Sequence, residues 1–281
     1  MSVPLSTTTL GRPPIIAVLG PTASGKTALA IQVARALDGE VISLDSLQVY
    51  YHAPILTAAP SAEEKAQAPH HLVTYLPPDE EPKTYFDDFF TAMDQIQRKG
   101  KAVVVCGGSM SFSGPVLREI SRQGRHLQVI VVCPPENVTR ERISKRFDGM
   151  LHSGMLDEVR ELWRMESDAG GDMRGRGIWK AIGYEELKTW ASLVEQGRDE
   201  MEIERALCEG LCTMKENTYR YANEQVKYLW ERLVPELQKG GTHVMRLSTA
   251  DLTSKSMSAD MESQVKRTVI EGEDSFQGMI V

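Results

Sequence analysis

Short runs of apolar, mostly β-branched residues alternate along the chain with longer stretches whose apolar positions recur every three to four residues. Five runs have the length and composition of buried strands: Ile15 to Leu19, Val41 to Leu44, Ala102 to Cys106, Gln128 to Cys133 and, with a weaker pattern, His243 to Leu247. Continuous apolar runs of this length are typical of strands that are covered on both faces. The alternation predicts an α/β fold, a P-loop-type parallel sheet with helices on both faces and ligands at the carboxyl ends of the strands.

The helical patterns fall into two groups. The first group separates the strands and includes residues 26–37 and a helix that begins near Phe86, after a Pro- and Ala-rich connection from Tyr51 to Pro82. After Cys133 helix follows helix, and this predicts a second, helical lobe. Its segments are Glu136 to Met150, Leu156 to Met165, Ile182 to Val194 and Met201 to about Leu237, with the glycine-rich Asp168 to Gly177 as a connection.

These patterns predict a division of the chain into four parts. We expect a core domain over residues 12–135, a helical lobe over 136–240, a return strand to the core within 241–250, and a polar tail over 251–281 with a short helix at Gln264 to Glu271. The formal net charge is −7, so no general positive field attracts a long polyanion such as a nucleic acid.

The four cysteines show no paired C-x-x-C spacing, which predicts a reduced protein without zinc. Cys208 and Cys212 are one helical turn apart, and we expect them to pack inside a helical interface. The first fourteen residues lack the apolar segment of a signal peptide, and no run of about eighteen apolar residues occurs. These features predict a cytoplasmic protein that does not associate with a membrane.

A glycine-rich segment directly follows the first strand. It reads Gly20-Pro-Thr-Ala-Ser-Gly-Lys-Thr27 and matches the P-loop pattern G-x-x-x-x-G-K-[ST] in full. In such a loop backbone N–H groups surround a diphosphate, the lysine adds a flexible positive charge, and the threonine hydroxyl is offered to Mg²⁺. We therefore predict a diphosphate site and assign the Mg²⁺ contact to Thr27. The predicted diphosphate-binding residues of the loop are Gly20, Thr22, Ala23, Ser24, Gly25, Lys26 and Thr27.

Asp45 ends the second strand, in Val-Ile-Ser-Leu-Asp, and three roles are open for it from the sequence alone. A carboxylate in this position holds Mg²⁺ through water in Walker B strands. It also suits a general base that accepts a proton from a weak nucleophile across the phosphates. The sequence Asp45-Ser46 is equally typical of a helix cap.

Several further motifs resemble one family in the order in which that family carries them. They are GPTASGKTALA, VISLDSLQVY, APHHL at Ala68 to Leu72, VVCGGSMSF at Val104 to Phe112, RISKRFDGMLHSGMLDEVR at Arg142 to Arg160, GIWKAIGYEE at Gly177 to Glu186, and KENT at Lys215 to Thr218. Together they resemble the isopentenyltransferases that prenylate the N6 amine of adenine, which comprise tRNA dimethylallyltransferases and cytokinin-forming adenylate isopentenyltransferases. The resemblance covers most of the chain, from Ile15 to Leu233.

The resemblance implies a prenyltransferase that moves a dimethylallyl group from dimethylallyl diphosphate to an adenine nucleotide, with Mg²⁺ as cofactor. It implies that Asp45 is the base, that Lys26 stabilises the leaving diphosphate, and that Ser109 holds the diphosphate or the incoming amine. Lys180 is a further candidate for diphosphate binding. The candidate acceptor pocket consists of Ser46, Gln48, Thr57, His70 and His71.

Two sets of residues keep alternative interpretations. His70 and His71 either contact the substrate or anchor a loop through hydrogen bonds. The basic cluster of Arg140, Arg142, Lys145 and Arg146 either closes over phosphates or forms a solvated helix face.

The nature of the acceptor follows from what the chain does not carry. The tRNA-modifying members of the family have a helical insertion after the GG-S/T motif, whereas only about a dozen residues separate Phe112 from the next strand here. With the acidic balance, this favours AMP, ADP or ATP and disfavours tRNA.

Several family positions are altered, and this leaves other functions open. The chain has Ala59 for a lysine, Phe112 for a tyrosine, Trp179 and Lys180 for paired arginines, and Glu224 for an arginine. Fewer cations and more apolar side chains favour a diverged enzyme that takes a longer allylic diphosphate or another acceptor, or that ionises or cyclises the diphosphate as a terpene synthase does. A small-molecule P-loop kinase or NTPase and a catalytically inactive regulatory protein are the alternatives from other classes.

Overall fold

A computed structural model describes residues 13–248 of the chain. Its centre is a six-stranded sheet with the order β3-β2-β4-β1-β5-β6, and every pair of neighbouring strands is parallel. The strands are β1 (Ile15–Leu19), β2 (Glu40–Leu44), β3 (His70–His71), β4 (Val103–Gly107), β5 (Leu127–Val132) and β6 (His243–Leu247). The predicted α/β class is confirmed, and the five predicted strands form within one residue of their expected ends.

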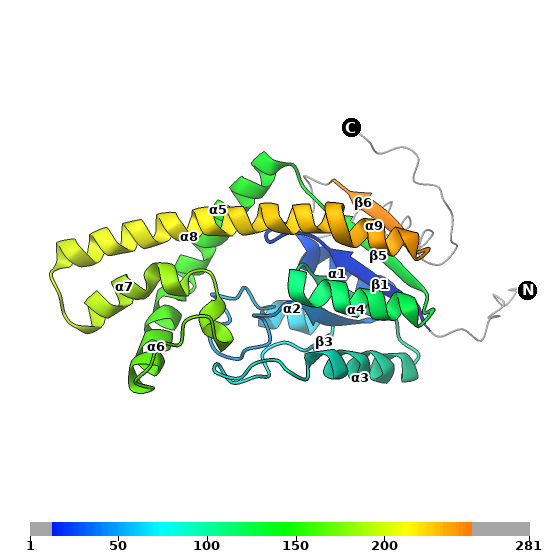
Figure 1. The fold of residues 1–281 in the computed structure, drawn as a ribbon, viewed down its shortest axis with the longest axis horizontal. Coiled ribbons are helices and arrows are strands. Elements are labelled where there is room, and N and C mark those ends of the chain that lie inside the picture. The colour runs from blue at the N-terminus through cyan, green and yellow to red at the C-terminus, as the bar shows by residue number, and fades with distance from the viewer. Residues whose placement is uncertain (1–12, 249–281) are drawn as a thin grey trace, which may run out of the picture.

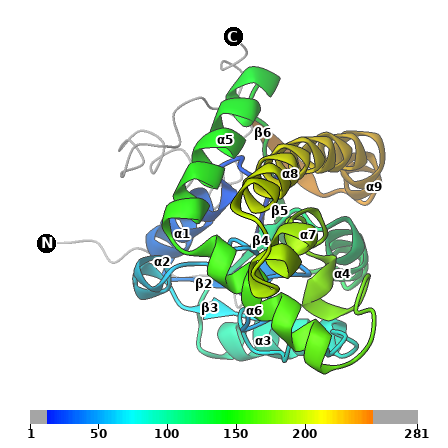
Figure 2. The ribbon, with the colours of Figure 1, turned by 90° about the vertical axis from the view of Figure 1, so that its left-hand side faces the viewer.

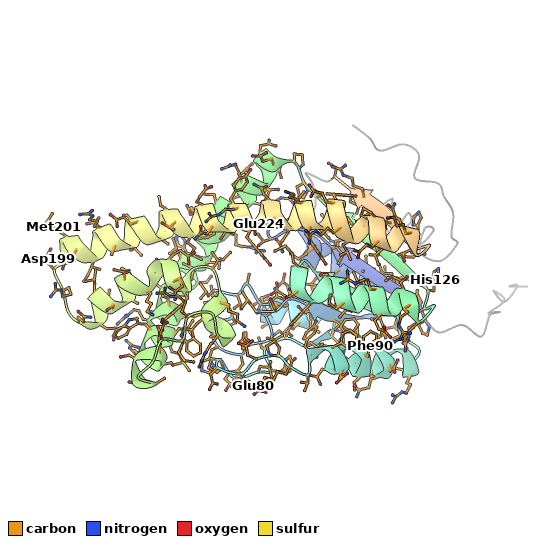
Figure 3. All side chains as sticks on the ribbon, in the orientation of Figure 1. Glu80, Phe90, His126, Asp199, Met201 and Glu224 are labelled. Atoms are coloured by element: carbon orange, nitrogen blue, oxygen red, sulfur yellow. The ribbon has the colours of Figure 1, made fainter. Side chains whose placement is uncertain are left out.

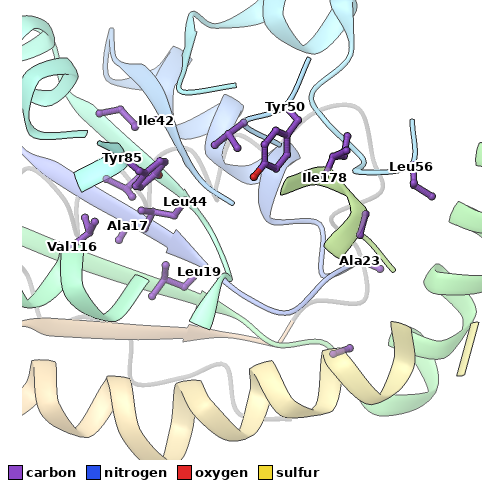
Figure 4. Close-up of a cluster of buried hydrophobic side chains, with 14 of the residues drawn as sticks. Ala17, Leu19, Ala23, Ile42, Leu44, Tyr50, Leu56, Tyr85, Val116 and Ile178 are labelled. Carbon is purple, nitrogen blue, oxygen red and sulfur yellow. The ribbon is translucent and has the colours of Figure 1, made fainter. Parts of the chain in front are cut away.

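Helices cover both faces of the sheet, as its apolar strands require. One face packs on α1 (Lys26–Ala36), whose Leu29 and Val33 are fully buried. The other face packs on α3 (Tyr85–Arg98) and α4 (Met110–Arg122), which contribute Phe89 and Leu117 to the larger core cluster. Figure 4 shows part of this cluster, where Ala17 and Leu44 of the sheet lie near Tyr85 and Val116.

The segment after β5 is helical, as the sequence predicts. It consists of α5 (Glu136–His152), α6 (Met155–Asp168), the short 3₁₀ helix η1 (Gly177–Lys180), α7 (Tyr184–Glu195), α8 (Glu200–Tyr228), the π-helical η2 (Leu229–Leu233) and α9 (Val234–Lys239). In Figure 1 α8, continued by η2 and α9, extends along the length of the molecule, from the pairing of α8 with α7 at one end to the contact of α9 with β6 at the other. Seen from the left-hand end of that view, α6 and α7 lie in front of the sheet (Figure 2).

Three elements were not expected from the sequence. The connection between Tyr51 and Pro82 contains the six-residue α2 (Ala62–Gln67) and the two-residue β3, which are too short to produce a periodic pattern. Helix α4 carries Gly114 and Pro115, both poor helix formers, and forms because its apolar side packs on the sheet. The expected helix at Gln264 to Glu271 lies outside the described residues.

Candidate active site

The P-loop has the backbone geometry that its sequence predicts. Ala23 and Gly25 adopt left-handed conformations with φ of 60° and 91°, which turn the chain sharply between β1 and α1. A side chain at Gly20 would place its Cβ only 2.5 Å from the carbonyl oxygen of Val132. Glycine is therefore required where the loop leaves the sheet, and the loop leads directly into the start of α1, where the positive end of the helix dipole favours anions.

The side chains of the loop are arranged for an anionic ligand. Lys26 extends its Nζ to within 3.2 Å of the carbonyl oxygen of Pro21, so its charge lies over the loop. Burial lowers the pKa of Lys26, as expected for an ammonium group that lacks its normal hydration. The hydroxyl of Ser24 is buried and has no hydrogen-bond partner within the described protein. A bound phosphate oxygen would supply the missing partner.

Two arginines from α5 reach the P-loop. Arg142 donates from Nη1 to the carbonyl oxygen of Ser24 at 2.8 Å, and Arg146 donates from Nη1 to the hydroxyl oxygen of Thr22 at 3.1 Å. By contrast, Arg140 and Lys145 pair with Glu136 and Glu141 on the exposed side of the same helix. The predicted basic cluster thus divides into a face toward the P-loop and a solvated face.

Asp45 lies at the carboxyl end of β2 and is held by the backbone that follows it. Its Oδ1 accepts hydrogen bonds from the N–H groups of Leu47 at 2.9 Å and Gln48 at 3.4 Å. Burial lowers the pKa of Lys26 and Arg146, and the nearby charge of Asp45 partly opposes this effect in both. The carboxylate therefore lies near the cations of the P-loop, and a turn fixes the orientation of its Oδ1.

The two glycines before Ser109 bring β4 against its neighbours. A Cβ on Gly107 would lie 2.4 Å from the carbonyl oxygen of Leu44, and one on Gly108 would lie 2.2 Å from that of Gly20. Because neither contact tolerates a side chain, β4 can deliver Ser109 between β2 and the P-loop. The Ser109 hydroxyl is buried, 3.0 Å from the hydroxyl of Ser111 and 3.5 Å from that of Ser46.

Gln225, on α8, connects the P-loop with the GG-S motif, and sequence analysis did not single it out. Its Oε1 accepts from the backbone N–H of Thr22 at 2.8 Å, and its Nε2 donates to the carbonyl oxygen of Gly108 at 2.8 Å. It also contacts Tyr221, whose pKa rises to about 12 because of burial and the nearby charge of Asp45. The only signal in the sequence is an uncharged polar residue on the inward side of a long helix.

The candidate acceptor residues fall into two places. Ser46 and Gln48 follow Asp45 directly, and Gln48 is held by the hydroxyl of Ser43 at 3.0 Å. Thr57 is buried and donates its hydroxyl to the carbonyl oxygen of Ala53 at 3.1 Å. Contact of these residues with an acceptor stays a prediction.

The two histidines form β3 at the edge of the sheet, paired with the first half of β2. His71 Nε2 lies 2.7 Å from Oε2 of Glu40, and His70 Nδ1 lies 2.8 Å from the carbonyl oxygen of Ala68. These contacts support the anchoring interpretation, because Asp45 lies at the opposite end of β2.

Lys180 pairs with Glu81, its Nζ lying 2.6 Å from the carboxylate, and its binding of a diphosphate stays a prediction. Two further sequence interpretations need revision. Trp179 is buried in the helical lobe and donates its indole N–H to the carbonyl oxygen of Leu162 at 3.2 Å, so it adds no apolar surface beside the P-loop. Cys208 and Cys212 are exposed on α8 and do not pack in an interface, because the inward side of the helix falls on Gly210 and Met214.

The donor set at the P-loop fits Mg²⁺. Mg²⁺ prefers oxygen ligands and is held in phosphate sites by one or two protein oxygens together with the substrate's phosphates. Thr27 lies in the first turn of α1, directly behind the loop, and carries a hydroxyl oxygen. Asp45 is the carboxylate near Lys26 of the loop. Within residues 13–248 no cluster of three or more His, Cys, Asp or Glu side chains could hold a metal without the substrate.

None of the helices that the structure describes combines the length and apolar character needed to cross a bilayer.

These features define a P-loop α/β protein in which a carboxylate, Asp45, lies near the cations of the loop at the carboxyl edge of the sheet. The model of the family described as IPP transferase matches residues 48–125 and 113–232. The chain belongs to this family and is therefore an isopentenyltransferase-type enzyme and not a small-molecule kinase.

Relatives of both acceptor types are similar to the chain. A "bifunctional cytokinin biosynthesis protein" of Fusarium pseudograminearum is 36% identical over 85% of the chain, which spans 49% of that protein. The adenylate isopentenyltransferase 8 of Arabidopsis thaliana is 30% identical over 83% of the chain and 76% of its own length. The tRNA dimethylallyltransferase of Desulfotalea psychrophila is 29% identical over 81% of the chain and 71% of its own length.

Solved structures confirm the fold. The tRNA isopentenylpyrophosphate transferase of Bacillus halodurans superposes with a TM-score of 0.69 at 22% identity, covering 92% of this chain and 97% of that one. A eukaryotic dimethylallyltransferase that acts on tRNA gives a TM-score of 0.70 at 22% identity, covering 93% and 79% of the two chains.

Proposed function

We propose that the protein transfers a dimethylallyl group from dimethylallyl diphosphate to the N6 amine of an adenine nucleotide, as in cytokinin formation. The observation that carries this proposal is the placement of Asp45, which is oriented by two backbone N–H groups and lies near Lys26 and Arg146. A base opposite a cationic diphosphate site suits the displacement of a diphosphate by a weakly nucleophilic amine.

In the proposed reaction the allylic C–O bond breaks, its electron pair leaves with the diphosphate, and the N6 nitrogen forms the new bond to carbon. Lys26, Arg146 and the loop amides stabilise the negative charge that develops on the leaving group. Asp45 hydrogen-bonds the amine, orients it and takes its proton. Mg²⁺ at Thr27 would add positive charge beside the diphosphate.

Three observations support a nucleotide acceptor. The Fusarium and Arabidopsis relatives carry names that refer to cytokinin biosynthesis and to adenylate. The described segment between β4 and β5 contains α4 alone, with no further helix. The net charge of −7 also disfavours tRNA.

The decisive experiment is mass spectrometry of products formed from dimethylallyl, geranyl or farnesyl diphosphate with Mg²⁺ and either AMP, ADP, ATP or tRNA. We expect a dimethylallyl adduct of an adenine nucleotide. Adducts on tRNA alone would reassign the acceptor. Adducts from the longer donors alone would support the diverged enzyme, and diphosphate release with a hydrocarbon or alcohol product would refute prenyl transfer to adenine.

A further inference from the structure

A short turn at residues 53–59 has amide groups that the turn itself does not satisfy. Within it the N–H groups of Thr57, Ala58 and Ala59 donate to the carbonyls of Ala53, Ile55 and Pro54 at 2.9–3.0 Å. The turn therefore resembles the first turn of a helix, whose leading N–H groups need partners from elsewhere.

Glu158, on α6, supplies those partners. Its Oε1 accepts from the N–H of Ile55 at 2.9 Å and its Oε2 accepts from the N–H of Leu56 at 2.8 Å. One carboxylate thus caps both amides from a part of the chain about a hundred residues away. A negative charge in this position is favourable because the amide ends of the turn carry partial positive charge.

Apolar packing also holds the turn at residues 53–59 against the helical lobe. Leu56 is 5% exposed and lies on the lobe side of the core cluster (Figure 4). A Cβ on Gly183 would lie 2.6 Å from Cδ1 of Leu56 and equally close to Cε of Met214, so the start of α7 closes tightly around this side chain. The turn is therefore fixed by a hydrogen-bonded carboxylate and by a well-packed leucine.

The other end of the turn is bonded to the segment that carries Asp45. The carbonyl oxygen of Ala58 accepts from Nε2 of Gln48 at 2.9 Å, and the backbone N–H of Gln48 donates to Oδ1 of Asp45. A continuous path of contacts thus runs from Glu158 through the turn and Gln48 to Asp45.

We infer that Glu158 is a positioning residue that aligns the acceptor side of the active site by fixing the turn at residues 53–59 against Asp45. This inference rests on the proposed function for the identity of the acceptor. It does not involve the P-loop, because none of the contacts in the path includes a residue of residues 20–27.

The test compares Glu158→Gln with Asp157→Asn, which removes the neighbouring carboxylate that is 84% exposed on the same helix. The Gln amide has one acceptor oxygen where the carboxylate uses two, so Glu158→Gln sets an NH2 group against one of the two N–H groups and should lower kcat/KM for the acceptor about tenfold or more. Binding of inorganic pyrophosphate, measured by calorimetry, should change less than about twofold. Hydrogen exchange at Ile55 and Leu56 should accelerate, and Asp157→Asn should behave as the wild type.

Three outcomes would overturn the inference: unchanged exchange at the two amides, an unchanged kcat/KM for the acceptor, or an equal loss of pyrophosphate affinity. If Glu158→Gln does not fold, Glu158→Asp keeps the charge at a shorter reach and is judged by the same criteria. If the wild type prenylates no adenine nucleotide, the proposed function fails. The hydrogen-exchange measurement still decides whether Glu158 fixes the turn. The kinetic comparison is then made with the acceptor that the product analysis identifies.

Discussion

Asp45 illustrates how a single residue can combine a local turn with the chemical role that we propose. Its Oδ1 accepts from Leu47 and Gln48, as an Asp after a strand often does, so two of its three sequence interpretations, the cap and the base, are compatible with one geometry. The second oxygen is the one that can meet a substrate amine. A base whose orientation is fixed in advance needs no rearrangement when the acceptor binds.

We expect Asp45→Asn to lower kcat by about 10²- to 10⁴-fold, because the amide cannot take the proton from the amine. Pyrophosphate affinity should change little, since Asp45 does not belong to the P-loop.

Lys26→Ala should weaken pyrophosphate binding and turnover together, because the lysine meets the diphosphate before and during bond breaking. Calorimetry with pyrophosphate and steady-state kinetics measure both effects, and an unchanged kcat in Asp45→Asn would refute the role of the base.

The sequence predicts residues whose function depends on local pattern and misses those that act across the fold. The P-loop and Asp45 are encoded by contiguous motifs, so their positions follow from spacing alone. Gln225 bonds a partner 203 residues away, and no local pattern marks it. Glu158 lies within the family-like motif at residues 142–160, but nothing in that motif reveals its partners about a hundred residues away. Lys180 is paired with Glu81 in the structure, and its contact with a diphosphate stays a prediction.

At the scale of elements, α5 shows how helical periodicity separates two functions. Arg142 and Arg146 are four residues apart and therefore project from the same side toward the P-loop, while Lys145 pairs with Glu141 in solvent.

Arg146→Gln tests this division with Lys145→Gln as its matched control. Arg146 contacts Thr22 beside the diphosphate site, so its loss should weaken pyrophosphate binding about tenfold, which corresponds to about 1.4 kcal/mol. Lys145 is 74% exposed, and its loss should leave binding unchanged. Equal affinities of the two variants, measured by calorimetry, would show that α5 contributes nothing to the diphosphate site.

Elements were predictable where the sequence carries a clear hydrophobic pattern. This pattern is a continuous apolar run in the strands on either side of β4 and a repeat of three to four residues in the long helices of the second lobe. Helix α4 was not, because Gly114 and Pro115 weaken its helical pattern, while contacts of Val116 and Leu117 with the sheet stabilise it. Tertiary packing overrides local propensity at this point.

At the scale of the whole molecule, two carboxylates join the α/β layer to the helical lobe in opposite directions. Glu158 reaches from the lobe to the connection after β2, and Glu81 reaches from that connection to η1. Glu81 accepts from Nζ of Lys180 and from the backbone N–H of Gly177 at 2.9 Å, next to a hydrogen bond from Ile178 to Pro78. Glu80, which precedes Glu81 in the sequence, is exposed on the lower edge of the molecule in Figure 3. It is the control residue for the substitution of Glu81.

The stability that Glu81 adds by joining the connection after β2 to η1 should depend on pH. Hydrogen bonds from Lys180 and from the Gly177 N–H hold the pKa of Glu81 below the ordinary glutamate value of 4.5. Folding therefore favours the ionised carboxylate, and this stabilisation is complete above the ordinary pKa and is lost as the pH falls through the lowered one.

Glu81→Gln should accordingly reduce the free energy of unfolding at about pH 7 and have less effect as the pH approaches the lowered pKa. The side chains of Lys180 and Glu81 are 42% and 38% exposed, so the loss should stay below about 1 kcal/mol. Urea unfolding across the pH series measures the difference between wild type and variant, and Glu80→Gln should show none of this dependence. A difference that stays constant with pH would mean that packing around Gly177, and not the charge of Glu81, joins η1 to the connection, since a Cβ on Gly177 would lie only 1.9 Å from the carbonyl oxygen of Pro78.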